Sequence, residues 1–190
     1  MNISNFLRET LQIENPALIC EMLAMCKIDL IKKGKQLIRQ GQQVDSVYFL
    51  VEGICRGFFS DINGKDITDS LVAQSGLPLI AATDFKAPAP ISIQVLVDSR
   101  VLRISTANFE SLLSRFPDAS AIYQNILIWY GNFHRELKIM AYQYDTNQRY
   151  HWFLEKYPTV IDKISHKYIA SFLNMSPVTL SRLIHTSDSQ

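Results

Sequence analysis

The spacing of hydrophobic residues divides the chain into a helical part, a β part and a second helical part. In residues 2–29 apolar residues recur every three or four positions, which predicts two helices, the second capped by Asn15. Short apolar runs punctuated by glycines then predict an antiparallel roll or barrel over residues 33–105. Within it, residues 61–64 predict a hairpin turn, and the Pro- and Ala-rich residues 77–90 predict an irregular or helical insertion.

The helical spacing returns at about residue 106, with a short helix over 108–115 and a long one from Pro117. Six apolar residues of the long helix are spaced by four, three, four, four and three positions, close to a coiled-coil seam. Such a seam needs a facing surface, which is either the chain's own roll or a second copy. The length of the helix favours a second copy. The predicted dimer interface within residues 118–142 consists of Ile122, Ile126, Trp129, Phe133, Leu137 and Met140.

Residues 165–185 predict two short helices joined by a tight corner. Ser165 begins the first helix as its N-cap, and Asn174 ends it, because asparagine tolerates the left-handed backbone region. Ser176 then caps the second helix, whose first residue is Pro177. The small Ala170 allows the two helices to cross closely. The pattern is typical of a helix-turn-helix, with an ordinary helical hairpin as the alternative.

Composition limits the chemistry that the chain can carry. The 190 residues are 47% hydrophobic, enough for a real core, and the net charge is only +1, so any contact with nucleic acid comes from a local surface. Residues 143–190 contain five Lys and Arg against four Asp and Glu, which is few for a DNA-binding module. Neither a secretion signal nor an apolar run long enough to cross a membrane is evident. We therefore expect a cytoplasmic protein.

Longer stretches carry a resemblance to a known family. The stretch KKGKQLIRQGQQVDSVYFLVEGICRGFF is similar to the opening strands of its β-roll, and RYHWFLEKYP with KYIASFLNMSPVTLSRL is similar to its DNA-binding end. The chain thus resembles the cyclic-AMP receptor/FNR (Crp/Fnr) superfamily of bacterial transcription regulators, in its Bacteroidetes-type branch. The implied α+β fold has an N-terminal, jelly-roll-like antiparallel roll with flanking helices, a long dimerisation helix and a C-terminal helix-turn-helix. The sequence departs from the family at IHTSDSQ, where we expect no β-wing. The implied domains are residues 1–117 for the sensor, 118–144 for the dimerisation helix and 145–190 for DNA binding.

The resemblance also implies roles for single residues. Arg182 falls where a family arginine reaches a base edge, and its planar fork suits guanine O6 and N7; the alternative is a solvated or phosphate-bound cation. Pro177 and Val178 replace the charged base-contacting residues of many relatives, so they offer only apolar contact. The positions expected to contact the DNA backbone are Ser165, His166, Ser176 and Thr179.

The sensor half departs from relatives that bind cyclic nucleotides. These use a glutamate for the ribose and an arginine for the cyclic phosphate, yet residues 70–97 contain neither residue type, and Pro88 to Pro90 stand where the arginine is expected. Cyclic AMP or GMP is therefore not expected as the ligand. The effector is unknown, and only Thr83, Asp84 and Lys86 offer weak candidate contacts.

Cofactor and enzyme chemistry is not predicted. All four histidines follow the roll, so no imidazole metal site can form inside it. The three cysteines Cys20, Cys26 and Cys55 form no C-x-x-C pair, are too few for an iron–sulfur cluster and are expected to be buried thiols. We expect neither a metal nor a cofactor.

These observations predict a homodimeric transcription regulator that binds double-stranded DNA, with RNA polymerase and a small-molecule effector as further candidate partners and no membrane association. The alternative is a degenerate relative that serves as an oligomerisation or protein-interaction module and has lost specific DNA binding. The low local charge and the Pro177-Val178 pair favour that alternative.

Overall fold

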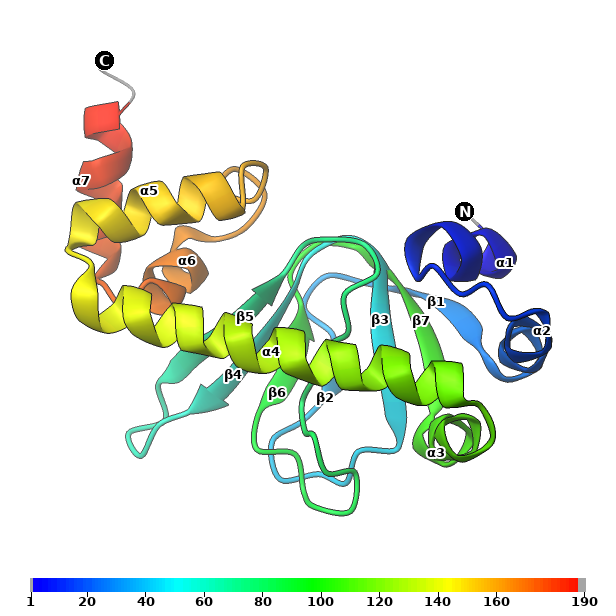
Figure 1. Cartoon of the computed structure of the whole chain (residues 1–190). Coiled ribbons are helices and arrows are strands. Elements are labelled where there is room, and N and C mark those ends of the chain that lie inside the picture. The colour runs from blue at the N-terminus through cyan, green and yellow to red at the C-terminus, as the bar shows by residue number, and fades with distance from the viewer. Residues whose placement is uncertain (1, 188–190) are drawn as a thin grey trace.

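The computed structural model describes residues 2–187 as two antiparallel sheets, a long helix across them and a cluster of short helices (Figure 1). One sheet has the strand order β1-β7-β3 and the other β2-β6-β4-β5. The two sheets together are here called the roll. Leu50, Cys55, Val95 and Val101 are fully buried in its core. The α+β prediction with an antiparallel roll is confirmed. The strands are β1 (Lys27–Ile31), β2 (Gln36–Ile38), β3 (Ser46–Glu52), β4 (Cys55–Ser60), β5 (Asp66–Val72), β6 (Ser92–Val95) and β7 (Ser99–Ser105).

The N-terminal helices cover one end of the three-stranded sheet. They are α1 (Ile3–Asn5), the π-helical turn η1 (Phe6–Thr10) and α2 (Pro16–Met25), which Asn15 caps through its side-chain oxygen as predicted. The helical prediction for residues 2–29 is wrong for the last of them, because the backbone becomes extended at Cys26. The strand β1 follows at once and pairs with β7, with Lys27 opposite Arg103.

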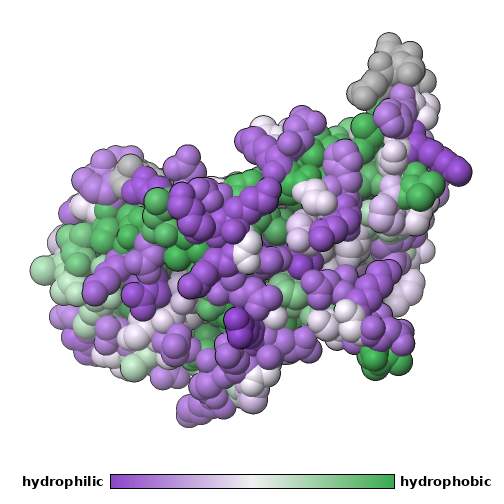
Figure 2. Space-filling model, turned by 180° about the vertical axis from the view of Figure 1, so that it is seen from behind, coloured by the Kyte–Doolittle hydropathy of each residue, from purple (hydrophilic) through white to green (hydrophobic). Residues whose placement is uncertain are grey.

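Turn chemistry defines the β4–β5 hairpin as predicted. The carboxylate of Asp61 accepts hydrogen bonds from the backbone N–H groups of Asn63 (2.8 Å) and Lys65 (2.9 Å), and Gly64 has a φ of +75°. Ile62 is fully exposed at the tip of this hairpin. Figure 2 shows a small hydrophobic spot at the lower right, the side toward which the hairpin projects. The hairpin therefore projects from the sheet with its backbone satisfied by its own turn.

Gly53, between β3 and β4, has a φ of +119°, and a Cβ there would lie 2.0 Å from Ser99 Oγ. Only glycine fits this crossing. The insertion over residues 77–90 contains no helix or strand among the described residues and is irregular.

The long helix α4 (Pro117–Gln143) follows α3 (Thr106–Arg115) and runs across the front of both sheets (Figure 1). At its far end the chain turns sharply into three helices, here called the head: α5 (Thr146–Lys156), α6 (His166–Phe172) and α7 (Pro177–Ser187). The carboxylate of Asp145 caps α5, and Gln148 completes a capping box. The predicted order of helices is thus confirmed.

One apolar core continues from the roll through α4 into the head. It joins roll, α4 and head side chains, including Ile54, Leu71, Leu96, Phe133, Met140, Phe153, Leu173 and Leu180. Since one core holds the three parts together, the head is packed against the roll rather than tethered to it. The predicted absence of a β-wing concerns the residues after α7, of which 188–190 lie outside the residues that the structure describes.

Candidate nucleic-acid interface

The first helix of the predicted helix-turn-helix is α6, which begins directly after Ser165. The Ser165 backbone is extended as in an N-cap, but its side chain makes no capping hydrogen bond. Ala170 is completely buried where the small residue was predicted. Asn174 has a φ of +50°, the left-handed conformation expected of the residue that ends the helix. Ser165 and His166 are both exposed at the start of α6.

The second helix, α7, begins with a complete N-cap. Ser176 Oγ accepts a hydrogen bond from the Thr179 backbone N–H at 3.0 Å and lies 2.8 Å from the Thr179 hydroxyl. Pro177 occupies the first position, where no N–H is needed. The two hydroxyls that were predicted to contact DNA backbone are therefore held together at the start of α7.

The exposed face of α7 carries the remaining candidates. Arg182 and Pro177 are exposed, and Val178 is 61% exposed, whereas Leu180 is completely buried against the rest of the head. Among the described residues of α7 there is no carboxylate. This face of α7 is open to solvent, and Arg182 is the arginine on it.

Two serine-to-alanine substitutions test whether a hydroxyl stabilises the start of its helix. Ser176→Ala is expected to lower the free energy of unfolding by about 1 kcal/mol, since it leaves the first turn of α7 without its cap. Ser165→Ala is the matched control and is expected to change stability by less than about 0.5 kcal/mol, because its hydroxyl caps nothing. Urea unfolding curves measure both. Equal losses from the two variants would contradict the role given to Ser176.

Arg56 on β4 joins the roll to the head. Its side chain is only 2% exposed and donates hydrogen bonds to Gln94 Oε1 (2.9 Å) and Asp66 Oδ2 (3.0 Å). The guanidinium carbon lies 3.9 Å from the ring centre of Phe58 and 4.1 Å from that of Tyr168 in α6. A buried cation between two rings gains cation–π attraction in a site from which water is excluded. This guanidinium faces the head and is thus not available to a ligand inside the roll.

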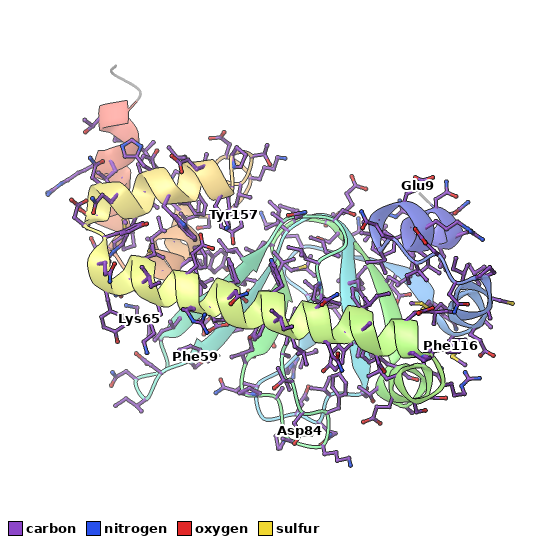
Figure 3. The ribbon with its side chains drawn as sticks, viewed as in Figure 1. Glu9, Phe59, Lys65, Asp84, Phe116 and Tyr157 are labelled. Carbon is purple, nitrogen blue, oxygen red and sulfur yellow. The ribbon has the colours of Figure 1, made fainter. Side chains whose placement is uncertain are left out.

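Two hydrogen bonds reinforce this contact at the edge strand β5. The backbone N–H of Thr68 donates to Ser171 Oγ of α6 at 2.9 Å, and the Tyr157 hydroxyl donates to the Leu71 carbonyl at 3.1 Å. Burial raises the pKa of Tyr157, so its hydroxyl stays protonated and can donate. Figure 3 shows Tyr157 at the end of α5, above the strands. The edge of the four-stranded sheet is thereby covered by the head.

Arg149 of α5 fixes the pair of helices α6 and α7 to the end of α4. Its guanidinium donates to the carbonyl oxygens of Ala141 (3.0 Å), Tyr144 (3.0 Å) and Asn174 (3.0 Å), and to that of Leu173 (3.3 Å). These carbonyls belong to the end of α4, the corner before α5 and the turn between α6 and α7. One side chain therefore satisfies backbone acceptors from three places and sets their relative position.

Another contact between α4 and β5 involves two ionisable side chains. His134 Nε2 lies 4.0 Å from Asp69 Oδ2 and has no hydrogen-bond partner in the described chain. Burial raises the pKa of Asp69 above its ordinary value, while the nearby His134 acts in the opposite direction. The charged form of the Asp69 carboxyl is thus destabilised where β5 meets α4.

The apolar stripe assigned to a dimer partner packs within its own chain. Phe133 is 8% and Met140 2% exposed, and Leu137 packs against the same core. Ile122 and Ile126 pack on the N-terminal helices and the three-stranded sheet, and only Trp129 is exposed, at 37%. In the single chain this stripe is the side by which α4 covers its own roll and head, and the assignment of these residues to a dimer interface stays a prediction. Dimerisation itself stays a prediction.

The weak ligand candidates lie on the surface of the 77–90 insertion. Thr83, Asp84 and Lys86 are exposed, and Figure 3 shows Asp84 pointing outward from the loop. Behind them Phe85, Phe109 and Tyr123 pack ring against ring, with centroids 5.3–6.4 Å apart. The hollows beside these rings measure only about 30 and 40 Å³. The candidate side chains are therefore not directed at an internal cavity.

Cysteine placement only partly matches the expectation. Cys26 and Cys55 are buried, and burial raises the pKa of each thiol to about 12. Cys20 is exposed on α2, so its predicted burial is wrong. Among the described residues, no group of three or more histidine, cysteine or acidic side chains could hold a metal. Nor does any described helix have the length and hydrophobicity to span a membrane.

Sequence reasoning missed Arg56, Arg149 and Tyr157. Arg149 and Tyr157 looked like ordinary helix residues, and no local signal distinguishes them. Arg56 stands inside an apolar β-segment, CRGFF, where a cation needs a partner to be buried. That mismatch was the available signal.

Comparisons place this geometry among known proteins. Residues 29–116 match the family model of the cyclic nucleotide-binding domain. FixK2 from Bradyrhizobium japonicum is similar with a TM-score of 0.79 at 12% identity, over 87% of this chain and 85% of that chain. A protein described as a Crp/Fnr-family transcriptional regulator, from Eubacterium rectale, gives 0.73 at 13% identity, over 97% and 88%. The chain has the fold of the Crp/Fnr regulators.

A further structural match extends over nearly the whole chain. The catabolite activator protein of Thermus thermophilus has a TM-score of 0.55 at 19% identity, over 97% of this chain and 87% of that chain. A comparison with curated proteins found no match. The fold that the resemblance to the Crp/Fnr superfamily implied is thus confirmed.

Proposed function

We propose that this Crp/Fnr-type chain is a transcription regulator that inserts α7 into the major groove of double-stranded DNA. The observation that carries the proposal is the two-sided character of α7, with Leu180 completely buried and Arg182 exposed. Arg182 contacts a base edge, while Ser165, His166, Ser176 and Thr179 contact the backbone and set the register. Pro177 and Val178 add apolar contact, such as with a thymine methyl group.

The regulator acts as a homodimer through the outer side of α4. Exposed residues recur there at spacings of four and three, as in a coiled-coil seam. Ile128 is 63%, Ile139 44% and Tyr142 81% exposed. Gly131 weakens an exposed helix by about 1 kcal/mol relative to alanine, and a Cβ there would meet nothing within 4 Å in its own chain. Close approach of a second helix accounts for the glycine at this position. This outer stripe consists of Ala121, Asn125, Ile128, Asn132, Arg135, Ile139 and Tyr142.

Introducing a charge into the outer stripe is expected to separate the two copies. Ile128→Asp should weaken the dimer at least about 100-fold, since each copy loses apolar burial and gains a carboxylate near the symmetry axis. Ile62→Asp is the matched control, because Ile62 is fully exposed on the β4–β5 hairpin, away from α4. Sedimentation equilibrium measures both. A wild-type monomer at micromolar concentration, or an unaffected Ile128→Asp dimer, would contradict this assignment.

We infer that the roll does not take a cyclic nucleotide. Ligand pockets for small molecules occupy about 300–1,000 Å³, far more than the hollows beside Phe85 and Tyr123. The charged residues of segment 70–97 are Asp84 and Lys86, and both are exposed. This segment therefore supplies no buried cation that could bind the phosphate of a cyclic nucleotide. The residues present do not fit that ligand.

A gel-shift experiment tests the regulator function. The full chain should bind its own promoter region in preference to a scrambled duplex, at both low and physiological salt. The second candidate function is an oligomerisation or interaction module without specific DNA binding, favoured by the low charge of residues 143–190. Binding without sequence preference at either salt concentration would support that second function and overturn the first.

A further inference from the structure

A hollow of about 450 Å³ lies where the roll, α4 and the head meet. The roll contributes Leu71 and the residues that follow β5, including Gln74. Helix α4 contributes Trp129 and Phe133, and the end of α5 with the next turn contributes residues 156–160. The volume lies in the range of small-molecule binding sites and exceeds that of the hollows beside the 77–90 insertion about tenfold. None of the sequence-based ligand candidates lines it.

The aromatic part of the wall is already ordered. Trp129 stacks on Phe133 with ring centres 5.5 Å apart and ring planes 6° from parallel. Phe133 is buried, whereas Trp129 remains 37% exposed at the hollow. A tryptophan held by its neighbour loses little further freedom when a ligand stacks on it, so a flat ring binds there at low entropic cost. Leu71, Leu77 and Val160 supply further apolar wall.

The charge at the wall is neutralised. Lys156 donates to both carboxylate oxygens of Glu136, at 3.1 and 3.0 Å, and the indole N–H of Trp152 also donates to this carboxylate. Burial acts to raise the pKa of Glu136, but these hydrogen bonds outweigh it and hold the pKa below its ordinary value. The Glu136 carboxylate thus stays charged and lies against the Lys156 side chain, so the pair leaves no net charge to attract an ion.

Two polar side chains at the hollow remain available. Gln74 and Thr159 are exposed and, within the described part of the chain, make no side-chain hydrogen bond. The Tyr157 hydroxyl, in contrast, is already used by the Leu71 carbonyl. The wall therefore offers one stacking surface, apolar contact and two neutral hydrogen-bonding groups.

We propose that this hollow binds an uncharged, planar aromatic small molecule and is the effector site of the protein. Because its walls come from the roll, α4 and the head, a ligand in it favours the arrangement in which these parts are packed together. A ligand that binds one arrangement better than another shifts the population between them. This coupling to DNA binding rests on the proposed regulator function, whereas binding at the hollow does not.

The neutral planar dye Nile red tests the site on the full chain. Wild-type protein should bind one dye per chain, with increased dye emission and quenching of tryptophan fluorescence. Ala73→Trp fills the hollow with a ring, and Trp129→Ala removes the stacking surface; each should weaken dye binding at least tenfold. Ala107→Trp is the matched control, since Ala107 is exposed on α3 and does not line the hollow. Thermal unfolding verifies that each variant is folded.

The outcomes separate the site from the regulator function. Absence of saturable binding to the wild type, or binding that neither Ala73→Trp nor Trp129→Ala weakens, would overturn the site. Loss of binding in both variants with retention in Ala107→Trp supports it, whether or not the protein binds DNA. If the chain binds its promoter, Nile red at saturation should change that affinity at least threefold. An unchanged affinity would overturn the effector role while the site stands.

Discussion

Replacing Arg182 with alanine is expected to abolish discrimination at one base pair of the operator, at a cost of about 1–3 kcal/mol for the preferred sequence. Arg182 is exposed on α7, opposite the buried Leu180, and its guanidinium can donate two parallel hydrogen bonds to guanine O6 and N7. With alanine, operator duplexes that differ only at that pair should bind with nearly equal affinity. Competition binding against a set of single-base variants measures the effect.

The control for Arg182→Ala is Arg39→Ala, because Arg39 is exposed on the roll after β2 and lies outside the head. It should leave both affinity and discrimination unchanged. A uniform loss of affinity across all sequences in Arg182→Ala, accompanied by a smaller salt dependence, would identify Arg182 as a phosphate contact. Arg182→Lys should then retain most of the affinity, whereas a base contact needs the planar fork.

Arg56→Ala is expected to lower the free energy of unfolding by about 3 kcal/mol and to loosen the head from the roll. The substitution leaves a void between Phe58 and Tyr168 and removes the donor to Gln94. Asp66 contributes little to the loss, because its side chain is 45% exposed and can be rehydrated. Urea unfolding gives the energy, and hydrogen exchange of the Thr68 amide, which donates to Ser171, reports the contact.

Two variants bracket this effect. Arg56→Met keeps most of the buried stem and should lose less than Arg56→Ala, so their difference measures packing apart from charge. Arg39→Ala should remain within about 0.5 kcal/mol of the wild type. If Arg56→Ala matched Arg39→Ala in stability and in the exchange of the Thr68 amide, Arg56 would have no part in joining head and roll.

The contact between head and roll has a consequence for regulation. Arg149 sets the α6–α7 pair against the end of α4, and Arg56 with Tyr168 sets α6 against β4 and β5. Any ligand that changes the packing of these strands against α4 therefore acts on the position of α7 through rigid contacts. The hollow beside Trp129 lies within the same junction.

The elements that the sequence predicted correctly have local causes. A cap, a turn or a helix start depends on a few neighbouring residues, and their conformational preferences act within one turn of backbone. Asn174 adopts the left-handed conformation, Ser176 caps α7, and residues 61–64 form a hairpin turn, all as expected. The roll and the order of helices followed from such signals together with hydrophobic periodicity.

The errors have non-local causes. Residues 27–31 continue an apolar pattern that fits a helix, but they form β1 because β7, more than 60 residues later, offers paired backbone groups. The stripe on α4 shows a similar ambiguity, because periodicity reveals that one side of a helix is covered but not what covers it. Phe133 and Met140 lie against the chain's own core, and the surface open to a second copy is the opposite side, with Ile128.

By itself the sequence determined the elements, the roll and the helix pair of residues 165–185, because caps, turns and periodicity are written in adjacent positions; the candidate DNA-contacting residues came from the resemblance to a family. Only the tertiary structure decided that Arg56 is buried against Tyr168 of the head, that α4 turns its most apolar side inward, and that a hollow opens beside Trp129. The physical reason is that burial and cavities depend on which distant surfaces meet, and one residue's chemistry does not specify its partner across the fold.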